Sequence, residues 1–403
     1  MPIATAAASP GLTTSGLRRV LAVLCVTEIT SWGILFYAFP VLAPEISQTT
    51  GWPTAWVVAA FSAGQVVAAL AGIPVGRWLD GRGPRSVMTA GSVLAVPAIV
   101  AVALAQNLVW FTVAWLLAGV AMGAVLYPPA FAALTRWYGP RRVFALTVLT
   151  LAAGLASTVF APLTALLTAH LDWRETYLVL AVVLAVVTIP AHLWGLRGPW
   201  PAAEPPLSTH SDPARIARGI PFRGLVIAFS LAAFAVYAGV INLVPLLTER
   251  GVSSTTAAIA LGLGGAGQVL GRLGYTTLTR LTTVQTRTAI VFLAAAATTA
   301  VLGLLTTTAG LIVAAIMAGM ARGVFTLLQA TAVADRWGTT HYGRLNALLQ
   351  APLTITVALA PWAGAAIASG IGGYSPTFLV LAAVTVVAAV LAFAATPHSG
   401  RNS

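Results

Sequence analysis

Three charged residues lie inside long apolar stretches of this sequence: Glu28, Arg272 and Arg322. Ionisable side chains are costly in such surroundings, so each is a candidate for function. An arginine keeps its charge and binds a carboxylate through two parallel hydrogen bonds, which makes Arg272 a candidate anion site. Gln268 lies four residues earlier, on the same face of a helix. Two arginines and one acid leave a net positive site, which favours an organic anion as ligand.

Each of these charges also has a structural interpretation. Glu28 either takes up and releases a proton as its surroundings change, or forms a permanent ion pair. Arg322 either sets the field of an anion site, or is a structural partner of Glu28 or of backbone carbonyls. Arg272 either binds the anion or extends to the nearby membrane surface.

Four uncharged polar residues are weaker candidates. Tyr127, which precedes a pair of prolines, either donates its hydroxyl to a carboxylate or packs as an aromatic side chain. Tyr37, Asn242 and Gln329 either contact a ligand or form hydrogen bonds between helices.

The elements that must position these residues are membrane-spanning helices. The sequence is 59% hydrophobic and 7% charged, and its mean hydropathy is +0.92, whereas soluble domains are about 25% charged. About twelve apolar runs are long enough to cross a bilayer. They end near residues 44, 75, 106, 135, 168, 195, 248, 278, 306, 334, 369 and 396. We therefore expect an all-α membrane protein whose helices cross the lipid bilayer.

The arginines predict how the helices are oriented, because loops kept in the cytoplasm carry an excess of basic residues. The chain has no lysine, and most of its 21 basic residues lie in loops on one side. The loops of the opposite side contain only Arg174 and Arg250, each beside an acid. Both termini are therefore expected in the cytoplasm, with tails at residues 1–17 and 397–403. The net charge of +12 is explained by topology, and nucleic-acid binding is not needed.

An internal repeat predicts two halves of six helices each. "AGVAMG" at 118–123 and "AGMARG" at 318–323 are 200 residues apart, and "YLVLA" at 177–181 and "FLVLA" at 378–382 have nearly the same separation. The halves are expected at 18–195 and 222–396, joined by a Pro-, Ser- and charge-containing cytoplasmic linker at 196–221.

Enzyme chemistry has little support in the sequence. The five histidines lie near helix ends, in the linker or in the tail, without the spacing of metal ligands, and no Gly-x-x-x-x-Gly-Lys-Ser/Thr loop is present. Cys25 is the single cysteine, so no intramolecular disulfide forms. We expect no catalytic residues, no metal and no cofactor.

The loop "GIPVGRWLDGRGPR" at 72–85 concentrates charge between two apolar runs. With the two-half repeat, it resembles the signature of the major facilitator superfamily between helices 2 and 3. The resemblance implies a conformational latch formed by Gly76, Asp80, Arg82, Gly83 and Arg85, in which Asp80 accepts hydrogen bonds from a helix end or an arginine. The corresponding segment 279–287 has no acid, so the latch is expected to be one-sided.

Three further motifs are similar to the monocarboxylate porter branch, which includes oxalate:formate antiporters. They are "WGILFYAFPVLAPEI" in helix 1, "LYPPAFAALTRWYGPRRVFAL" in helix 4 and "GQVLGRLGY" in helix 8. This similarity implies that Arg272 binds a substrate carboxylate, with Gln268 where the branch has Asp or Asn. It also implies that helices 1, 7 and 10 line the cavity. Val41 replaces a lysine of some animal members, so proton coupling through that position is not expected.

We therefore expect a monomeric secondary transporter of a small organic anion, with a proton as candidate co-substrate, in the cytoplasmic membrane of a bacterium. Its substrate site consists of Arg272, Gln268, Tyr127, Arg322, Tyr37, Asn242 and Gln329, and Glu28 serves coupling. The alternative is a multidrug or natural-product exporter of the same superfamily, which would have a more apolar and aromatic cavity.

Overall fold

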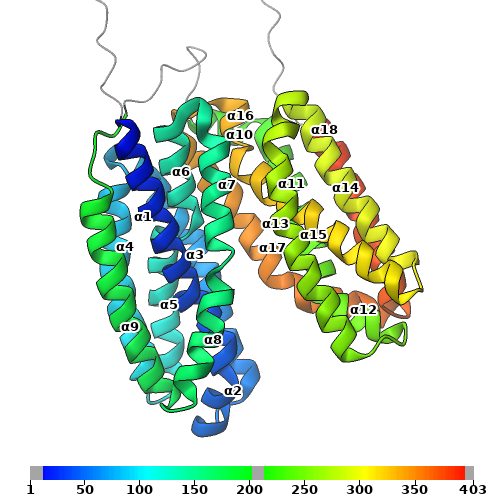
Figure 1. Cartoon of the computed structure of the whole chain (residues 1–403), viewed down its shortest axis with the longest axis horizontal. Coiled ribbons are helices and arrows are strands. Elements are labelled where there is room, and N and C mark those ends of the chain that lie inside the picture. The colour runs from blue at the N-terminus through cyan, green and yellow to red at the C-terminus, as the bar shows by residue number, and fades with distance from the viewer. Residues whose placement is uncertain (1–11, 202–212, 395–403) are drawn as a thin grey trace, which may run out of the picture. The chain divides into compact units, whose positions relative to one another are not determined.

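The structure is a computed structural model that describes residues 12–201 and 213–394, and the regular secondary structure of these residues is helical (Figure 1). The predicted tails and linker therefore lie partly outside the described residues. The first helices are α1 (Thr14–Trp32), α2 (Ala38–Thr50), α3 (Thr54–Arg82), α4 (Pro84–Ala103), α5 (Leu108–Val125), α6 (Tyr127–Tyr138), α7 (Arg142–Ala153), α8 (Ala156–Thr168) and α9 (Trp173–Pro190). After α10 (Pro213–Arg218), the remaining helices are α11 (Ile220–Ile241), α12 (Leu243–Glu249), α13 (Ser254–Leu281), α14 (Val284–Leu304), α15 (Thr308–Thr331), α16 (Ala334–Trp337), α17 (Tyr342–Ile371) and α18 (Tyr374–Ala394).

These helices account for the predicted apolar runs. Among the described residues, nine helical segments are long and apolar enough to cross a membrane, and one of them, Leu108–Phe160, is 53 residues long and holds two predicted runs. Helices α13 and α17, which are 28 and 30 residues long, supply the last two. The prediction of an all-helical membrane fold is therefore confirmed.

The chain divides into two compact units. The first consists of Met1–Leu207 and Thr339–Arg344, and the second of Ser208–Gly338 and Leu345–Ser403. The short segment at the start of α17 thus groups with the first unit. Each unit is described by itself below.

Glycines allow the closest helix pair of each unit to form. A Cβ atom at Gly119 of α5 would lie 2.2 Å from the carbonyl oxygen of Gly64 in α3. At the matching position of the second unit, a Cβ at Gly319 of α15 would lie 1.9 Å from the carbonyl oxygen of Gly264 in α13. Because no side chain fits at such distances, the backbones approach each other only with glycine at these positions.

A second contact repeats one turn along the same helices. A Cβ at Gly123 would lie 2.8 Å from the carbonyl oxygen of Ala68, and a Cβ at Gly323 would lie 2.1 Å from that of Gln268. The sequence spacing of 200 residues therefore corresponds to equivalent contacts in the two units. This equivalence allows positions in one unit to be compared with those in the other.

Several helices are interrupted in their course through the membrane. The first helical run passes through a π-helical segment, Gly33–Tyr37, between α1 and α2. Leu126 adopts an extended conformation between α5 and α6, and Asn242 separates α11 from α12. Interrupted helices leave backbone groups without intrahelical partners, and in transporters they mark binding sites. Tyr37, Tyr127 and Asn242 all lie at these interruptions.

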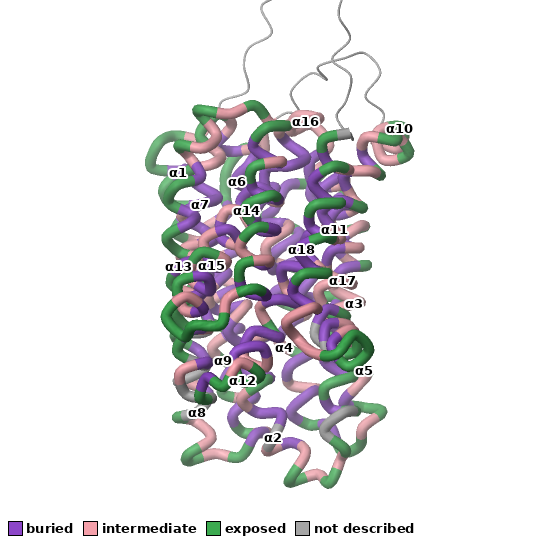
Figure 2. The backbone as a smooth tube through the Cα atoms, turned by 90° about the vertical axis from the view of Figure 1, so that its right-hand side faces the viewer, coloured by how far each residue is buried: buried purple, intermediate pink, exposed green. Residues whose placement is uncertain are grey.

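Buried and exposed residues alternate along the helices (Figure 2). Large apolar side chains are exposed on many of them, with Val186 at 68% and Val390 at 64%. Exposed apolar side chains are suited to contact with lipid tails. Glu28, Asn242 and Arg272, in contrast, are buried polar residues.

Candidate substrate-binding site

Gln268 and Arg322 form a polar pair inside the second unit. The Nε–H of Arg322 in α15 donates a hydrogen bond of 2.8 Å to Oε1 of Gln268 in α13. The glycine contacts between these helices bring the two side chains within reach of each other. The hydrogen bond fixes the plane of the guanidinium group, whose other nitrogens lie at the far end of the side chain.

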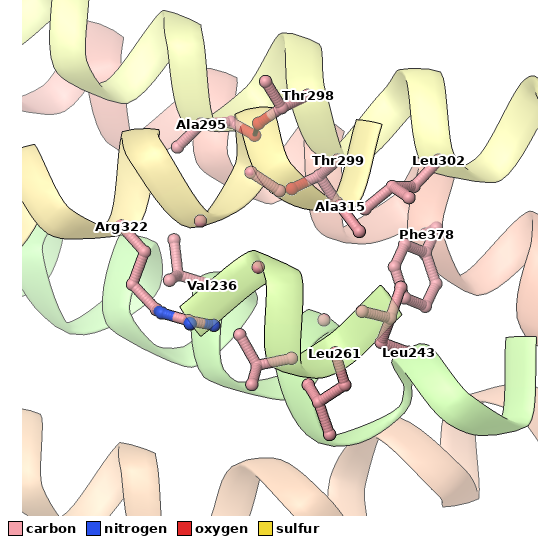
Figure 3. Close-up of a pocket in the computed structure, with 15 residues that line it drawn as sticks. Val236, Leu243, Leu261, Ala295, Thr298, Thr299, Leu302, Ala315, Arg322 and Phe378 are labelled. Atoms are coloured by element: carbon pink, nitrogen blue, oxygen red, sulfur yellow. Dashed lines mark hydrogen bonds between the residues drawn. The ribbon is translucent and has the colours of Figure 1, made fainter. Parts of the chain in front are cut away.

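The guanidinium of Arg322 extends toward a small cavity (Figure 3). The cavity has a volume of about 30 Å³, which is enough for roughly one or two water molecules. Residues of α11, α12, α13, α14, α15 and α18 line it. Most are apolar, including Leu261, Leu302 and Phe378, while Thr298 and Thr299 of α14 supply hydroxyl groups. The cavity therefore combines one cation with a largely apolar wall.

The matching positions of the first unit show that the fold does not require this pair. Position 68 is alanine where the second unit has Gln268, and position 122 is methionine where it has Arg322. Met122 is fully buried and accepts a hydrogen bond from the amide of Gln65 at Sδ. Because the same backbone contacts are made with apolar residues in the first unit, the polar pair is specific to the second.

Arg272 lies one turn after Gln268 on α13. Its side chain is 4% exposed, so it does not extend to the surface. The adjacent Gly271 packs against α15, where a Cβ would lie 2.2 Å from the carbonyl oxygen of Met320. Both predicted arginines thus belong to the second unit. Gln268 forms its hydrogen bond with Arg322.

Asn242 and Gln329 make hydrogen bonds to the protein. Asn242 is 4% exposed, and its amide donates to the carbonyl oxygen of Ala238 at 2.9 Å, at the break between α11 and α12. The amide of Gln329 in α15 donates to Oε1 of Gln350 in α17. The contact of Gln329 joins α15 to α17, whereas that of Asn242 stays within the segment that ends α11. A ligand role of either residue stays a prediction.

Glu28 lies in the interior of the first unit. Its side chain is fully buried in α1, and neither carboxylate oxygen makes a hydrogen bond to a described residue. The indole Nε1 of Trp32, one turn along the same helix, faces Glu28 without reaching hydrogen-bond geometry. A permanent ion pair of Glu28 with an arginine is therefore not found among the described residues.

Trp32 connects Glu28 to an aromatic cluster at the helix interruptions. The ring centroid of Trp32 lies 4.9 Å from that of Tyr127 and 6.4 Å from that of Tyr37. Tyr127 also stacks on Phe131 at 4.9 Å. The two predicted tyrosines are therefore neighbours of one tryptophan that the sequence analysis missed. Its spacing of four residues from Glu28 is a signal that was present in the sequence.

Asp80 caps the start of α17. Its Oδ1 accepts a hydrogen bond from the backbone N–H of Gly343 at 3.0 Å, and its Oδ2 accepts one from that of Arg344 at 2.9 Å. The first N–H groups of a helix have no intrahelical partner, and a carboxylate satisfies them well. Gly76 lies one turn earlier, and a Cβ at Gly343 would lie 2.8 Å from its carbonyl oxygen.

The other predicted latch residues differ in whether they lie near this contact. Gly83 ends α3 with a φ of 77°, a conformation that favours glycine. The Nε–H of Arg85 donates to the carbonyl oxygen of Leu193 at 2.8 Å. Arg82 is exposed and lies over the ring of Trp78 at 5.9 Å. Gly76, Asp80 and Gly83 thus belong to one contact region, whereas Arg82 points outward.

The second unit has an ion pair that the sequence analysis did not anticipate. Arg287, at the start of α14, contacts the carboxylate of Asp335 in α16 at 2.6 Å, and both side chains are buried. The expectation of a one-sided latch was based on the lack of an acid in 279–287. The pair of Arg287 and Asp335 is a different contact, so the one-sided latch stays a prediction.

Comparisons with known proteins agree with this architecture. Residues 21–310 match the family described as Major Facilitator Superfamily. Human monocarboxylate transporter 11 is 31% identical over 59% of this chain and 50% of its own length. Bovine monocarboxylate transporter 13 is 26% identical over 61% of this chain and 56% of its own. The chain thus spans about half the length of these curated relatives.

Solved structures show the same fold at low sequence identity. The E. coli fucose:proton symporter superposes with a TM-score of 0.73 at 16% identity, over 94% of this chain and 98% of the symporter. The human organic anion transporter MFSD10 superposes with a TM-score of 0.73 at 17% identity, over 93% of this chain and 99% of its own. With a family match over residues 21–310, the interrupted helices and the repeated glycine contacts, this chain belongs to the major facilitator superfamily of secondary transporters.

Proposed function

We propose that the protein transports a small organic monocarboxylate and that Arg322 binds the carboxylate group. The observation that carries this proposal is the hydrogen bond between Arg322 and Gln268 beside an apolar cavity. Gln268 holds Nε, and the guanidinium end faces the cavity (Figure 3). A guanidinium fixed in this way is suited to a planar anion.

The charge of the surrounding helices supports an anionic substrate. Neither α13 nor α15 contains an acidic residue, while each contributes one inward-facing arginine. Arg272, one turn from Gln268, adds a second positive charge. In this proposal Arg322 is the binding group and Arg272 strengthens the field, which reverses the roles expected from the sequence.

The lining of the cavity supports a substrate with a short apolar part. In this proposal the cavity, which has a volume of about 30 Å³ in this structure, widens in another access state to admit the substrate. Leu261, Leu302 and Phe378 offer hydrocarbon contacts, and the hydroxyls of Thr298 and Thr299 suit a small polar substituent. A mainly apolar wall with few polar groups is typical of small-molecule sites. The curated relatives named as monocarboxylate transporters point to the same class of substrate.

Glu28 is proposed to couple transport to protons. A carboxylate is costly when ionised and buried without a partner, so Glu28 is a position where a proton is bound in one conformation and released in another. Tyr127 and Tyr37, which neighbour Trp32, are proposed to contact the substrate through their hydroxyls. Asp80 serves as the latch that is made in one access state and released in the other.

The arginine distribution supports an orientation with both termini in the cytoplasm. We place the protein as a monomer in the cytoplasmic membrane of a bacterium. The six-helix halves at 18–195 and 222–396, joined by a linker at 196–221, are the bodies that move relative to each other during alternating access.

The test is uptake of labelled lactate, pyruvate, oxalate, formate and an aromatic acid into proteoliposomes, with and without an imposed pH gradient. We expect saturable uptake of one or more of these acids, stimulated when the outside is acidic. Arg322→Ala lowers the efficiency of uptake by about 10- to 100-fold, whereas Arg280→Ala, at the exposed end of α13, leaves it unchanged. Failure of all acids, with efflux of a lipophilic cationic dye, would contradict the proposal and favour an exporter.

A further inference from the structure

The start of the linker after α9 folds back onto the C-terminal end of α3. The indole Nε1 of Trp200 donates a hydrogen bond of 3.3 Å to the carbonyl oxygen of Asp80. The indole of Trp137 donates to the carbonyl oxygen of Pro199 at 3.2 Å, and its ring meets that of Trp200 edge to face at 5.5 Å. A tryptophan in a Pro- and Ser-containing linker is thus held by specific contacts.

Arg136 and Gly83 also lie close to the Trp200 ring. The guanidinium of Arg136 lies over the ring at 4.6 Å from its centroid, which is the geometry of a cation–π contact. A Cβ atom at Gly83 would lie 3.1 Å from the ring, so glycine at this position leaves room for the indole. Arg136 also donates to the carbonyl oxygen of Asp80, at 3.2 Å.

Asp80 is therefore the residue where two sets of contacts meet. Its backbone carbonyl accepts hydrogen bonds from Arg136 and Trp200, and its carboxylate accepts hydrogen bonds from the N–H groups of Gly343 and Arg344. All of these residues belong to the first compact unit. A change in the position of Trp200 thus acts on the same residue that caps α17.

We propose that Trp200 is a positioning residue that holds Asp80 in place to cap α17, so that the linker and the latch change state together. The linker then does not only connect the two halves. Displacing its first residues also weakens the contact of Asp80 with α17. The consequence for transport rests on the proposed function, in which Asp80 is released during alternating access.

The amide hydrogens of Gly343 and Arg344 provide a direct test. They lie in the first turn of α17, where N–H groups lack intrahelical partners, so their protection from solvent exchange depends on the Asp80 carboxylate. We would measure hydrogen–deuterium exchange by mass spectrometry on peptides that contain both residues. The full-length purified protein is used without any substrate.

Trp200→Ala is expected to accelerate exchange at these amides about tenfold, as Asp80→Ala does. In the double variant, Trp200→Ala adds nothing to Asp80→Ala, because both act on one contact. Trp200→Phe keeps a ring against Arg136 and Gly83 but loses the indole donor, and should give a smaller increase. Trp194→Ala removes an indole that is 56% exposed and should leave exchange unchanged.

Wild-type exchange in both Trp200 variants would overturn the proposal. An equal increase in Trp194→Ala would also overturn it, because the effect would then be general destabilisation. The exchange measurement needs no carboxylate, so a failure of uptake in proteoliposomes leaves this result interpretable. Conversely, normal exchange in the Trp200 variants leaves the assignment of Arg322 untouched.

Discussion

Arg322 donates its Nε–H to Oε1 of Gln268 at 2.8 Å, joining α15 to α13 inside the second unit. In the first unit the matching residues are Met122 and Ala68, and the same close helix packing forms without an arginine–glutamine pair. The repeat therefore acts as an internal control. A pair that one half omits without losing its packing is better explained by function than by stability.

Arg322→Ala is expected to lower the efficiency of carboxylate uptake by about 10- to 100-fold, because a charge-assisted hydrogen bond contributes about 1.5–3 kcal/mol. Gln268→Ala, which removes this hydrogen bond but keeps the charge of Arg322, should raise KM by roughly 3- to 10-fold. Initial rates in proteoliposomes over a range of substrate concentrations measure both effects. If Arg272→Ala abolishes uptake and Arg322→Ala does not, carboxylate binding belongs to Arg272.

Glu28→Gln is expected to uncouple transport from protons. The substitution keeps the shape of the side chain but removes its ability to bind and release a proton. Uptake of the labelled acid should then no longer respond to an acidic exterior, while exchange of labelled for unlabelled acid across the membrane continues. Glu175→Gln, in an exposed helix cap of the first unit, is the matched control. Gradient-driven uptake that persists in Glu28→Gln would assign coupling to another group.

The fold was predictable because bilayer crossing imposes a minimum length on each apolar run. The glycines at 119, 123, 319 and 323 were also readable as close-packing positions, since small residues spaced by four lie on one helix face. The break in the helix at Leu126 was harder to predict from the sequence. Proline is tolerated in the first turn of a helix, so the Pro-Pro pair after Tyr127 does not by itself show that the preceding helix has ended.

The candidate site was predicted as a set of residues but not as a set of contacts. Spacing of four places Gln268 and Arg272 on one face of α13, but the partner across the helix pair depends on the register between α13 and α15. That register is set by backbone contacts of Gly264 and Gly319, which only three-dimensional packing reveals. For the same reason, the pairing of Arg287 with Asp335 could not be obtained by comparing loops at a fixed spacing.

Gly319→Ala is expected to destabilise the protein by about 1–3 kcal/mol, because its Cβ would lie 1.9 Å from the carbonyl oxygen of Gly264 and the helices must separate. Gly262→Ala in α13 is the control, since its Cβ would meet nothing within 4 Å. Alanine there should be neutral or stabilising through helix propensity. Thermal denaturation of the detergent-purified protein, followed by size-exclusion chromatography, compares them. Equal stability of the two variants would show that α13 and α15 are not in close contact.

Glu249 caps the last helix of the second unit and makes its stability dependent on pH. Its carboxylate accepts hydrogen bonds from the backbone N–H groups of Tyr374 at 2.6 Å and Ser375 at 3.2 Å. The Glu249 side chain is exposed, and the slight loss of water around its carboxyl group acts to raise its pKa. The hydrogen bonds from Tyr374 and Ser375 and the charge of Arg250 outweigh it, so the pKa lies below its ordinary value of 4.5.

A carboxyl whose pKa is lower in the folded than in the unfolded state stabilises the fold above its ordinary pKa, and this contribution disappears as the pH falls through the folded value. Glu249→Gln should therefore lower the melting temperature slightly near pH 7, because the side chain is exposed and screened by solvent. As the pH falls through the folded-state pKa of Glu249, the two melting temperatures should converge, because both side chains are then neutral at this position. A difference in melting temperature that stays constant as the pH falls would show that the charge of Glu249 plays no part in capping α18.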